Sequence, residues 1–113
     1  MAAGASHGEA TFTGSGASIS GDMAIDAAQG VVRGGNVFHS FSVFNIGRLE
    51  SAVFTGPVDI RNVISRVTGT GSSLIDGPLS VAIPGANFFF INPNGVMFGA
   101  GASINVDGSA YFS

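Results

Sequence analysis

The sequence predicts an all-β protein, and three observations favour this class. Strand-forming residues are abundant, whereas helix formers are scarce, with no Lys and only three Leu in 113 residues. The apolar runs are short, and each ends at Gly, Pro, Asn or Asp. Eighteen glycines supply the tight turns that such a chain needs. We therefore expect a single domain over residues 1–113 built from many short strands.

Composition excludes several functions. Four Arg and seven acidic residues are spread along the chain without a run, giving a net charge of −3. Phosphate binding needs clustered Lys and Arg, so a nucleic-acid partner is not expected. The absence of Cys excludes disulfides and thiolate metal sites. No apolar run approaches the roughly 20 residues of a membrane-spanning helix.

The first third of the chain gives the weakest strand signals. Residues 1–10 read as a loose terminus. Residues 11–20, TFTGSGASIS, predict a short edge strand broken by Gly14 and Gly16. Residues 23–32, MAIDAAQGVV, are the one place where a helical turn competes, because alanine suits either state.

Residues 36–46, NVFHSFSVFNI, do not alternate cleanly between apolar and polar residues. A β-bulge near Ser40 to Ser42 would bring Phe38, Phe41 and Phe44 to one side, and one helical turn would do the same. We favour the bulge. The three phenylalanines are then a candidate aromatic binding patch.

Further strands are predicted at 52–60, 62–69, 72–83, 87–91, 96–98 and 103–106. Their spacing fits a sandwich, a barrel or a solenoid. Nearly all-apolar strands favour a parallel β-helix, in which inward side chains stack from one turn to the next. We expect Phe89, Ile91, Met97 and Ile104 or Val106 to fill one such column.

The tetrapeptide Asn92-Pro93-Asn94-Gly95 interrupts the most apolar part of the chain. Asn92 before a proline is held extended, and Pro93 fixes φ at the start of a turn. Asn94 and Gly95 tolerate positive φ, and Asn can bond its own downstream backbone. The tetrapeptide is therefore at least a rigid corner.

A series of motifs resembles the haemagglutination-activity domain of filamentous-haemagglutinin-like exoproteins, which is the two-partner secretion domain. The motifs are GNVFHSF at 35–41, FNI at 44–46, NVISRVTG at 62–69, IDG at 75–77 and ANFFFINPNGVMFG at 86–99. The resemblance runs from about Gly34 to Gly108, and the Asn-Pro-Asn-Gly element is its most specific part.

The resemblance implies a right-handed, single-stranded parallel β-helix with an N-terminal cap and small extra-helical β elements. It further implies a secretion address and folding nucleus for a large adhesin-like exoprotein, secreted or carried on the cell surface after transit through the periplasm. The implied partner is an outer-membrane β-barrel transporter whose periplasmic domains bind the chain while it is extended. The implied recognition or folding residues are Asn92, Pro93, Asn94, Gly95, Asn62, Ser65 and Arg66.

The sequence departs from the family in three ways. It has no signal peptide, it stops at Phe112-Ser113 where family domains continue, and it has one Asn-Pro-Asn element where related adhesins often have two. We expect a mature or truncated form, and the third departure leaves the subfamily of the transporter open.

Other residues favour structural roles. His39, between Phe38 and Phe41, is expected to pack rather than to bind a metal or to act in catalysis. Asp59, Asp76 and Asp107 are expected to form turns rather than a calcium site. Nothing in the sequence indicates an enzyme, a cofactor or a metal. Two alternatives stay open: a self-contained module that binds a host glycan or cell surface, and a structural solenoid that self-associates through its open ends.

Overall fold

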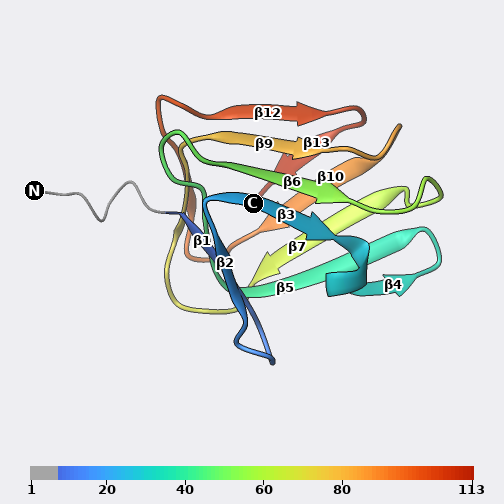
Figure 1. Ribbon diagram of the computed structural model, residues 1–113, viewed down its shortest axis with the longest axis horizontal. Helices are drawn as coiled ribbons and strands as arrows, with labels where there is room; N and C mark the ends of the chain where they lie inside the picture. Colours follow the sequence, from blue (N-terminus) through green and yellow to red (C-terminus); the bar gives the residue numbers. More distant parts are fainter. Residues whose placement is uncertain (1–7) are drawn as a thin grey trace, which may run out of the picture.

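The computed structural model describes residues 8–113 and shows a parallel β-solenoid (Figure 1). The solenoid expected from the sequence is thus confirmed. The strands are β1 (Glu9–Phe12), β2 (Ser18–Ser20), β3 (Asp22–Asp26), β4 (Val31–Arg33), β5 (Asn36–Asn45), β6 (Ser51–Thr55), β7 (Asn62–Val67), β8 (Ser73–Ile75), β9 (Pro78–Val81), β10 (Asn87–Ile91), β11 (Val96–Phe98), β12 (Ser103–Val106) and β13 (Ala110–Phe112). One 3₁₀ turn, η2 (Ala27–Gln29), follows β3.

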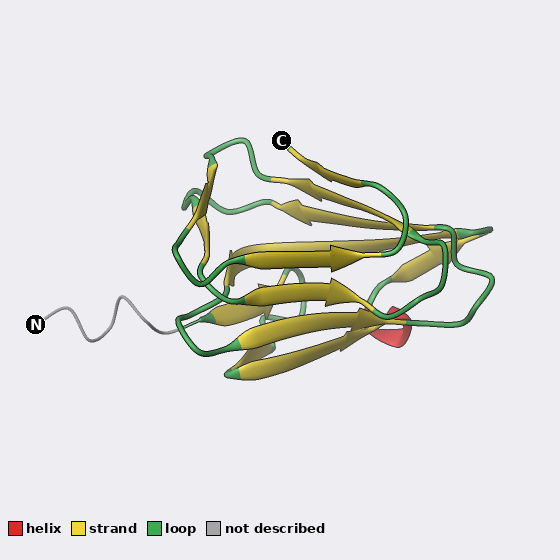
Figure 2. Ribbon diagram, turned by 90° about the horizontal axis from the view of Figure 1, so that it is seen from above, coloured by secondary structure: helices red, strands yellow, loops and turns green. Residues whose placement is uncertain are grey.

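The strands form three sheets that run along the solenoid (Figure 2). In sheet A, β5, β7, β10 and β13 lie side by side and parallel. Sheet B consists of β3, β6, β9 and β12, one strand from each successive turn. Sheet C is the short pair β8 and β11, to which Ile46 of the first turn adds an isolated parallel bridge.

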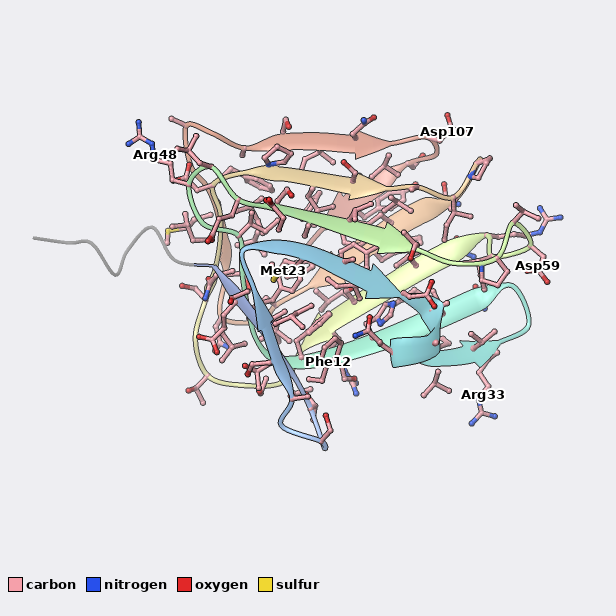
Figure 3. The ribbon with its side chains drawn as sticks, in the orientation of Figure 1. Phe12, Met23, Arg33, Arg48, Asp59 and Asp107 are labelled. Atoms are coloured by element: carbon pink, nitrogen blue, oxygen red, sulfur yellow. The ribbon has the colours of Figure 1, made fainter. Side chains whose placement is uncertain are left out.

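The interior is a continuous apolar core formed by alternate residues of β1, β3 and β5 to β10. It contains a chain of phenylalanine contacts, with ring centroids 5.0 Å apart between Phe41 and Phe44 and 5.1 Å apart between Phe44 and Phe90. The largest fully buried side chains are Phe41, Phe44, Phe54, Phe88, Phe90, Met23, Ile25, Ile46, Ile60, Ile75, Leu79 and Ile83. Charged side chains lie outside this core, and three of them, Arg48, Asp59 and Asp107, lie at corners between strands (Figure 3).

The inward column predicted for the last turns is wrong except at Val106, which packs against the core, whereas Ile91 and Ile104 are exposed. Phe88 and Phe90 point inward and are fully buried, whereas Phe89 lies on the outer face of sheet A and Met97 is exposed. Three consecutive phenylalanines carry no alternation, so the sequence does not indicate which of them faces the core. Register decides it: Phe88 lies beside the buried Val63 of β7, and Phe90 lies beside the buried Ser65.

The bulge predicted near Ser40 to Ser42 is present in β5, at Ser42. Thr11 of β1 lies opposite Val43, but the next residue, Phe12, lies opposite Phe41. The extra residue turns Phe44 to the same inner side as Phe41. Because the bulge follows Phe41, it leaves Phe38 on the outer face.

An N-terminal cap covers the edge of the first turn in sheet A. Both β1 and β4 pair antiparallel with β5, β1 along its second half and β4 along its first. β2 pairs with β1, so residues 11–20 form a hairpin rather than one broken strand. Residues 1–10 were expected to form a loose terminus. Residues 1–7 lie outside the described part of the chain, whereas Glu9 and Ala10 belong to β1. Ala10 is fully buried because β1 lies against β5.

The remaining predicted strands are found with small changes. The stretch 72–83 divides into β8 and β9 because the chain turns at Asp76 and Gly77. A Cβ on Gly77 would overlap the carbonyl oxygen of Glu50 in the preceding turn, so this corner depends on glycine. Within residues 8–113, no helix is long and apolar enough to span a membrane.

Candidate functional site

The corner at Asn92 to Gly95 joins β10 to β11 in the third turn of the solenoid. The backbone N–H of Gly95 donates to the carbonyl oxygen of Asn92 at 3.0 Å, which closes a β-turn with Pro93 in its second position. Gly95 has a φ of 109°, which favours glycine. The backbone N–H of Asn94 donates to Oδ1 of Asn92 at 2.9 Å, so the turn is closed twice.

The side chain of Asn92 is buried and fully hydrogen-bonded. Its amide nitrogen donates to the carbonyl oxygen of Gly71 at 3.1 Å and to the buried hydroxyl of Ser73 at 3.0 Å. Its oxygen accepts from the backbone and the side chain of Asn94. Both of its donors and both lone pairs are therefore used, half of them on the preceding turn.

Asn94 is exposed, yet it contacts the same preceding turn. Its amide nitrogen donates to the carbonyl oxygen of Gly69 at 2.8 Å and to Oδ1 of Asn92 at 3.2 Å. Gly69 in turn lies so close to the first turn that a Cβ there would overlap the carbonyl oxygen of Ser42. The corner thus connects three successive turns through Asn94, Gly69 and Ser42.

The other predicted recognition residues do not gather at this corner. Asn62 begins β7, at the opposite end of sheet A. Ser65 points into the core, and its hydroxyl has no hydrogen-bond partner among the described residues. Arg66 is exposed and lies beside Ile91, the residue before the corner.

The corner and its partners on the preceding turn lie within the part of the chain that a family model matches. A family model described as the TPS secretion domain matches residues 5–111. The chain belongs to this family. A search of curated proteins found no match to the chain. As a TPS domain, it is the secretion domain of an exoprotein that passes through the periplasm to the cell surface or beyond, and its system includes an outer-membrane transporter.

Sequence reasoning missed an asparagine ladder in this TPS domain. The amide of Asn62 donates to Oδ1 of Asn36 at 2.8 Å, and the amide of Asn87 donates to Oδ1 of Asn62 at 3.1 Å. Oδ1 of Asn87 then accepts from the backbone N–H of Ser109 at 2.9 Å. The signal was available, because the three asparagines are 26 and 25 residues apart and each begins its strand.

His39 is a packed histidine, as expected. It is 2% exposed and lies between Phe41 and Phe54, with ring centroids 6.1 and 5.5 Å away. Neither ring nitrogen has a hydrogen-bond partner within residues 8–113. Burial lowers the pKa of His39 from 6.5 to about 4, although the carboxylate of Asp26 acts in the opposite direction.

The structure separates the three phenylalanines of the predicted binding patch. Phe41 and Phe44 are buried in the core, and only Phe38 is exposed. Phe38 instead belongs to an outer column across sheet A, here called the apolar ladder, which consists of Val31, Phe38, Ile64, Phe89 and Tyr111. The rings of Phe89 and Tyr111 stack at 4.8 Å with their planes 9° apart.

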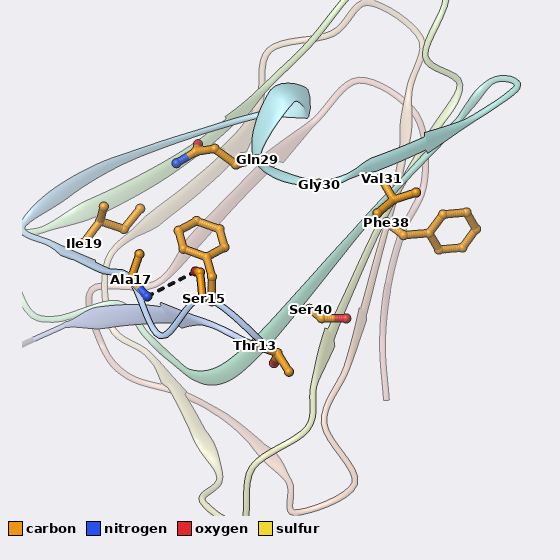
Figure 4. Close-up of a pocket in the computed structure, with 10 residues that line it drawn as sticks. Thr13, Ser15, Ala17, Ile19, Gln29, Gly30, Val31, Phe38 and Ser40 are labelled. Atoms are coloured by element: carbon orange, nitrogen blue, oxygen red, sulfur yellow. Dashed lines mark hydrogen bonds between the residues drawn. The ribbon is translucent and has the colours of Figure 1, made fainter.

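A cavity of about 470 Å³ lies between the tip of the β1–β2 hairpin and η2 (Figure 4). Its lining includes Phe12, Ile19 and Phe38, and its polar groups come from hydroxyls and Gln29. In the hairpin tip, the backbone N–H of Ala17 donates to the hydroxyl of Ser15 at 3.2 Å. The cavity lining contains no charged side chain.

Proposed function

We propose that this domain is the secretion address and the folding nucleus of its exoprotein. The periplasmic domains of the transporter bind the extended chain, and the solenoid forms after transit. The observation that carries the proposal is the set of hydrogen bonds that the Asn92–Gly95 corner makes with the preceding turn. Its side-chain amides bond to Gly69, Gly71 and Ser73 of the preceding turn, so these bonds exist only once two turns have stacked.

In the extended chain, the same amides and backbone groups are free to pair with a partner. A strand-forming segment without Lys can add to the edge of a partner sheet, with backbone hydrogen bonds giving affinity and alternate side chains giving specificity. Binding and folding then compete for one set of groups. Folding after transit would therefore release the transporter.

The direction of growth also supports a nucleating role. At the first turn, β1 and β4 cover the edge of β5 with antiparallel strands. At the last turn, β11, β12 and β13 are each paired on one side only within the described residues. Apolar side chains are exposed there, including Phe98 and Tyr111. In sheet A a further strand can therefore pair with β13 but not with β5, whereas in sheet B both β3 and β12 keep a free edge within the described residues.

The test measures binding between the cognate transporter's periplasmic domains and the TPS domain held unfolded in denaturant that the receptor tolerates. We expect Asn92→Ala and Asn94→Ala to weaken binding of the unfolded chain. Asn45→Ala is the matched control, because Oδ1 of Asn45 also accepts a bond from the next turn, at Leu74 N–H, but lies outside the tetrapeptide. Equal binding by all four chains, together with unchanged secretion, would leave the tetrapeptide as a structural corner only.

Ser65 offers a second, cleaner variant. Its buried hydroxyl has no partner in the described fold, so Ser65→Ala should not destabilise the solenoid. A loss of transporter binding in this variant would come from recognition of the extended chain. Retained binding would remove Ser65 from the recognition set.

A second candidate function is binding to a host surface through the apolar ladder. Tyr111 is 53% exposed and Phe38 is 41% exposed on one face of sheet A. Contiguous exposed apolar groups are common at interaction sites. Phe38→Ser and Tyr111→Ser should then abolish binding of the folded domain to cells or glycan arrays without reducing secretion. Unchanged binding in both variants would exclude the ladder.

A further inference from the structure

Asn94 has a chemical property that no other asparagine of this chain shares. Of the seven asparagines, it alone is followed by Gly. Four of the others precede Val or Ile, one precedes Phe and Asn92 precedes Pro93. A backbone nitrogen can attack the preceding asparagine side chain only if it carries a hydrogen, and the attack is fast only if the next side chain does not shield the nitrogen. Pro93 has no N–H, and branched or aromatic residues hinder the approach.

The reaction is deamidation through a cyclic imide. The backbone nitrogen of Gly95 forms a bond to Cγ of Asn94, and the bond from Cγ to Nδ2 breaks. The side-chain nitrogen leaves as ammonia and takes up the proton lost by the Gly95 nitrogen. Water then opens the ring at either carbonyl, giving aspartate or isoaspartate at position 94. The only co-reactant is water.

In the folded domain, both reacting nitrogens are held by hydrogen bonds. The attacking nitrogen, that of Gly95, donates to the carbonyl oxygen of Asn92 at 3.0 Å. The leaving nitrogen, Nδ2 of Asn94, donates to Gly69 at 2.8 Å and to Oδ1 of Asn92 at 3.2 Å. Cyclisation requires the corner to open and all three bonds to break. The unfolded chain has none of these restraints.

We propose that Asn94 is a deamidation site that folding closes, so that the unfolded form of this domain has a limited chemical lifetime. The product cannot rebuild the corner. An aspartate has no amide hydrogens, so its oxygens would face the carbonyl oxygen of Gly69 and Oδ1 of Asn92, both acceptors. Isoaspartate also lengthens the backbone within the closed turn. A chain that waits too long before folding thus loses the bond that Asn94 donates to the second turn.

The test compares two samples of the wild-type protein at the same mildly alkaline pH and temperature, one folded in buffer and one unfolded in guanidinium chloride. Peptide mapping by mass spectrometry follows the conversion of each asparagine with time. In the unfolded sample, we expect Asn94 to convert before any other asparagine. In the folded sample, its conversion should be slower by about tenfold or more, which corresponds to an opening free energy of at least about 1.4 kcal/mol. Equal rates at Asn94, or earlier conversion elsewhere in the unfolded chain, would overturn the proposal.

The consequence for folding has its own test. We expect Asn94→Asp, and wild-type protein aged in denaturant and then refolded, to show a folding equilibrium constant lower by about tenfold or more, because two donated bonds are lost. Asn105→Asp is the matched control, since it adds the same charge at an exposed asparagine of β12 that has no side-chain hydrogen bond among the described residues. An unchanged denaturation midpoint in Asn94→Asp would refute this consequence. Neither test uses the transporter, so their outcomes are independent of its recognition of the domain.

Discussion

The side-chain amide of Asn94 donates to the carbonyl oxygen of Gly69 at 2.8 Å, although the two residues are 25 positions apart. One turn of the solenoid is about this long, since Asn62 and Asn87 of the ladder are also 25 apart. The contact therefore joins equivalent corners of successive turns. Loss of such contacts should destabilise the stacking of turns rather than any one strand.

Asn92→Ala should lower the free energy of unfolding by about 2 kcal/mol, because it leaves the buried Ser73 hydroxyl and the Gly71 carbonyl without their donor. Asn94→Ala should cost about 1 kcal/mol, since water can replace an exposed amide. Equilibrium urea denaturation measures both. Asn105→Ala serves as the control and should change stability little. Equal losses in all three variants would contradict the cross-turn role.

Gly69→Ala should destabilise the domain by more than about 2 kcal/mol, because the added Cβ would overlap the Ser42 carbonyl and separate β5 from β7. Gly71 is the matched control two residues away. A Cβ at Gly71 meets nothing within 4 Å, so Gly71→Ala should be nearly neutral. Thermal melting of the two variants provides the comparison. A Gly69→Ala domain as stable as Gly71→Ala would mean that the turns are not packed this closely.

Asn62→Ala should cost about 1 to 2 kcal/mol, because it removes the middle of the asparagine ladder. Oδ1 of Asn36 loses its donor, and the amide of Asn87 loses its acceptor. Denaturation monitored by intrinsic tyrosine fluorescence or circular dichroism would measure the loss. A neutral Asn62→Ala would show that water replaces the ladder without penalty.

Stability should fall as the pH is lowered from about 6.5 towards 4. His39 has a pKa of about 4 in the folded domain and 6.5 as its ordinary value, so the unfolded chain binds a proton more readily across this window. Above pH 6.5 the contribution is intact, and by pH 4 roughly 3 kcal/mol would be lost. The neighbouring Asp26 titrates below the window, because the Ala28 N–H and the Thr55 hydroxyl lower its pKa.

His39→Leu tests this pH dependence. It keeps an apolar side chain in the core and removes the titrating group, and His7 remains as the other histidine of the sequence. Urea midpoints at pH 7 and pH 5 should differ clearly in the wild type and much less in His39→Leu. The same difference in both proteins would assign the acid sensitivity to other groups.

Much of the fold could be predicted because turn residues mark nearly every strand end. The positions of Gly, Pro, Asn and Asp located β6, β7, β10, β11 and β12 to within a few residues. A bulge near Ser40 to Ser42 was also predictable, since the apolar residues of β5 do not alternate cleanly, although one helical turn was an alternative from the sequence. What it does to Phe38 was not predictable, because that depends on which side of Phe41 the extra residue falls.

The remaining features depend on contacts between turns, which local sequence does not encode. Phe88 to Phe90 could face either way until the register with Val63 and Ser65 was known. The cap strands β1 and β4 are short and rich in small or exposed residues, so only their pairing with β5 defines them. At the candidate site, the sequence predicted the shape of the Asn92–Gly95 corner. It did not show that the corner's partners would be Gly69, Gly71 and Ser73.

The most direct test of the central claim is the amount of exoprotein secreted through the cognate transporter by Asn94→Ala and Asn45→Ala, each normalised to the measured stability of its folded domain. Both variants lose a bond between successive turns, but only Asn94 belongs to the tetrapeptide. We predict that Asn94→Ala reduces secretion well beyond what its stability explains, whereas Asn45→Ala does not. A single relation between stability and secretion that fits both variants would contradict a role for the corner in transporter recognition.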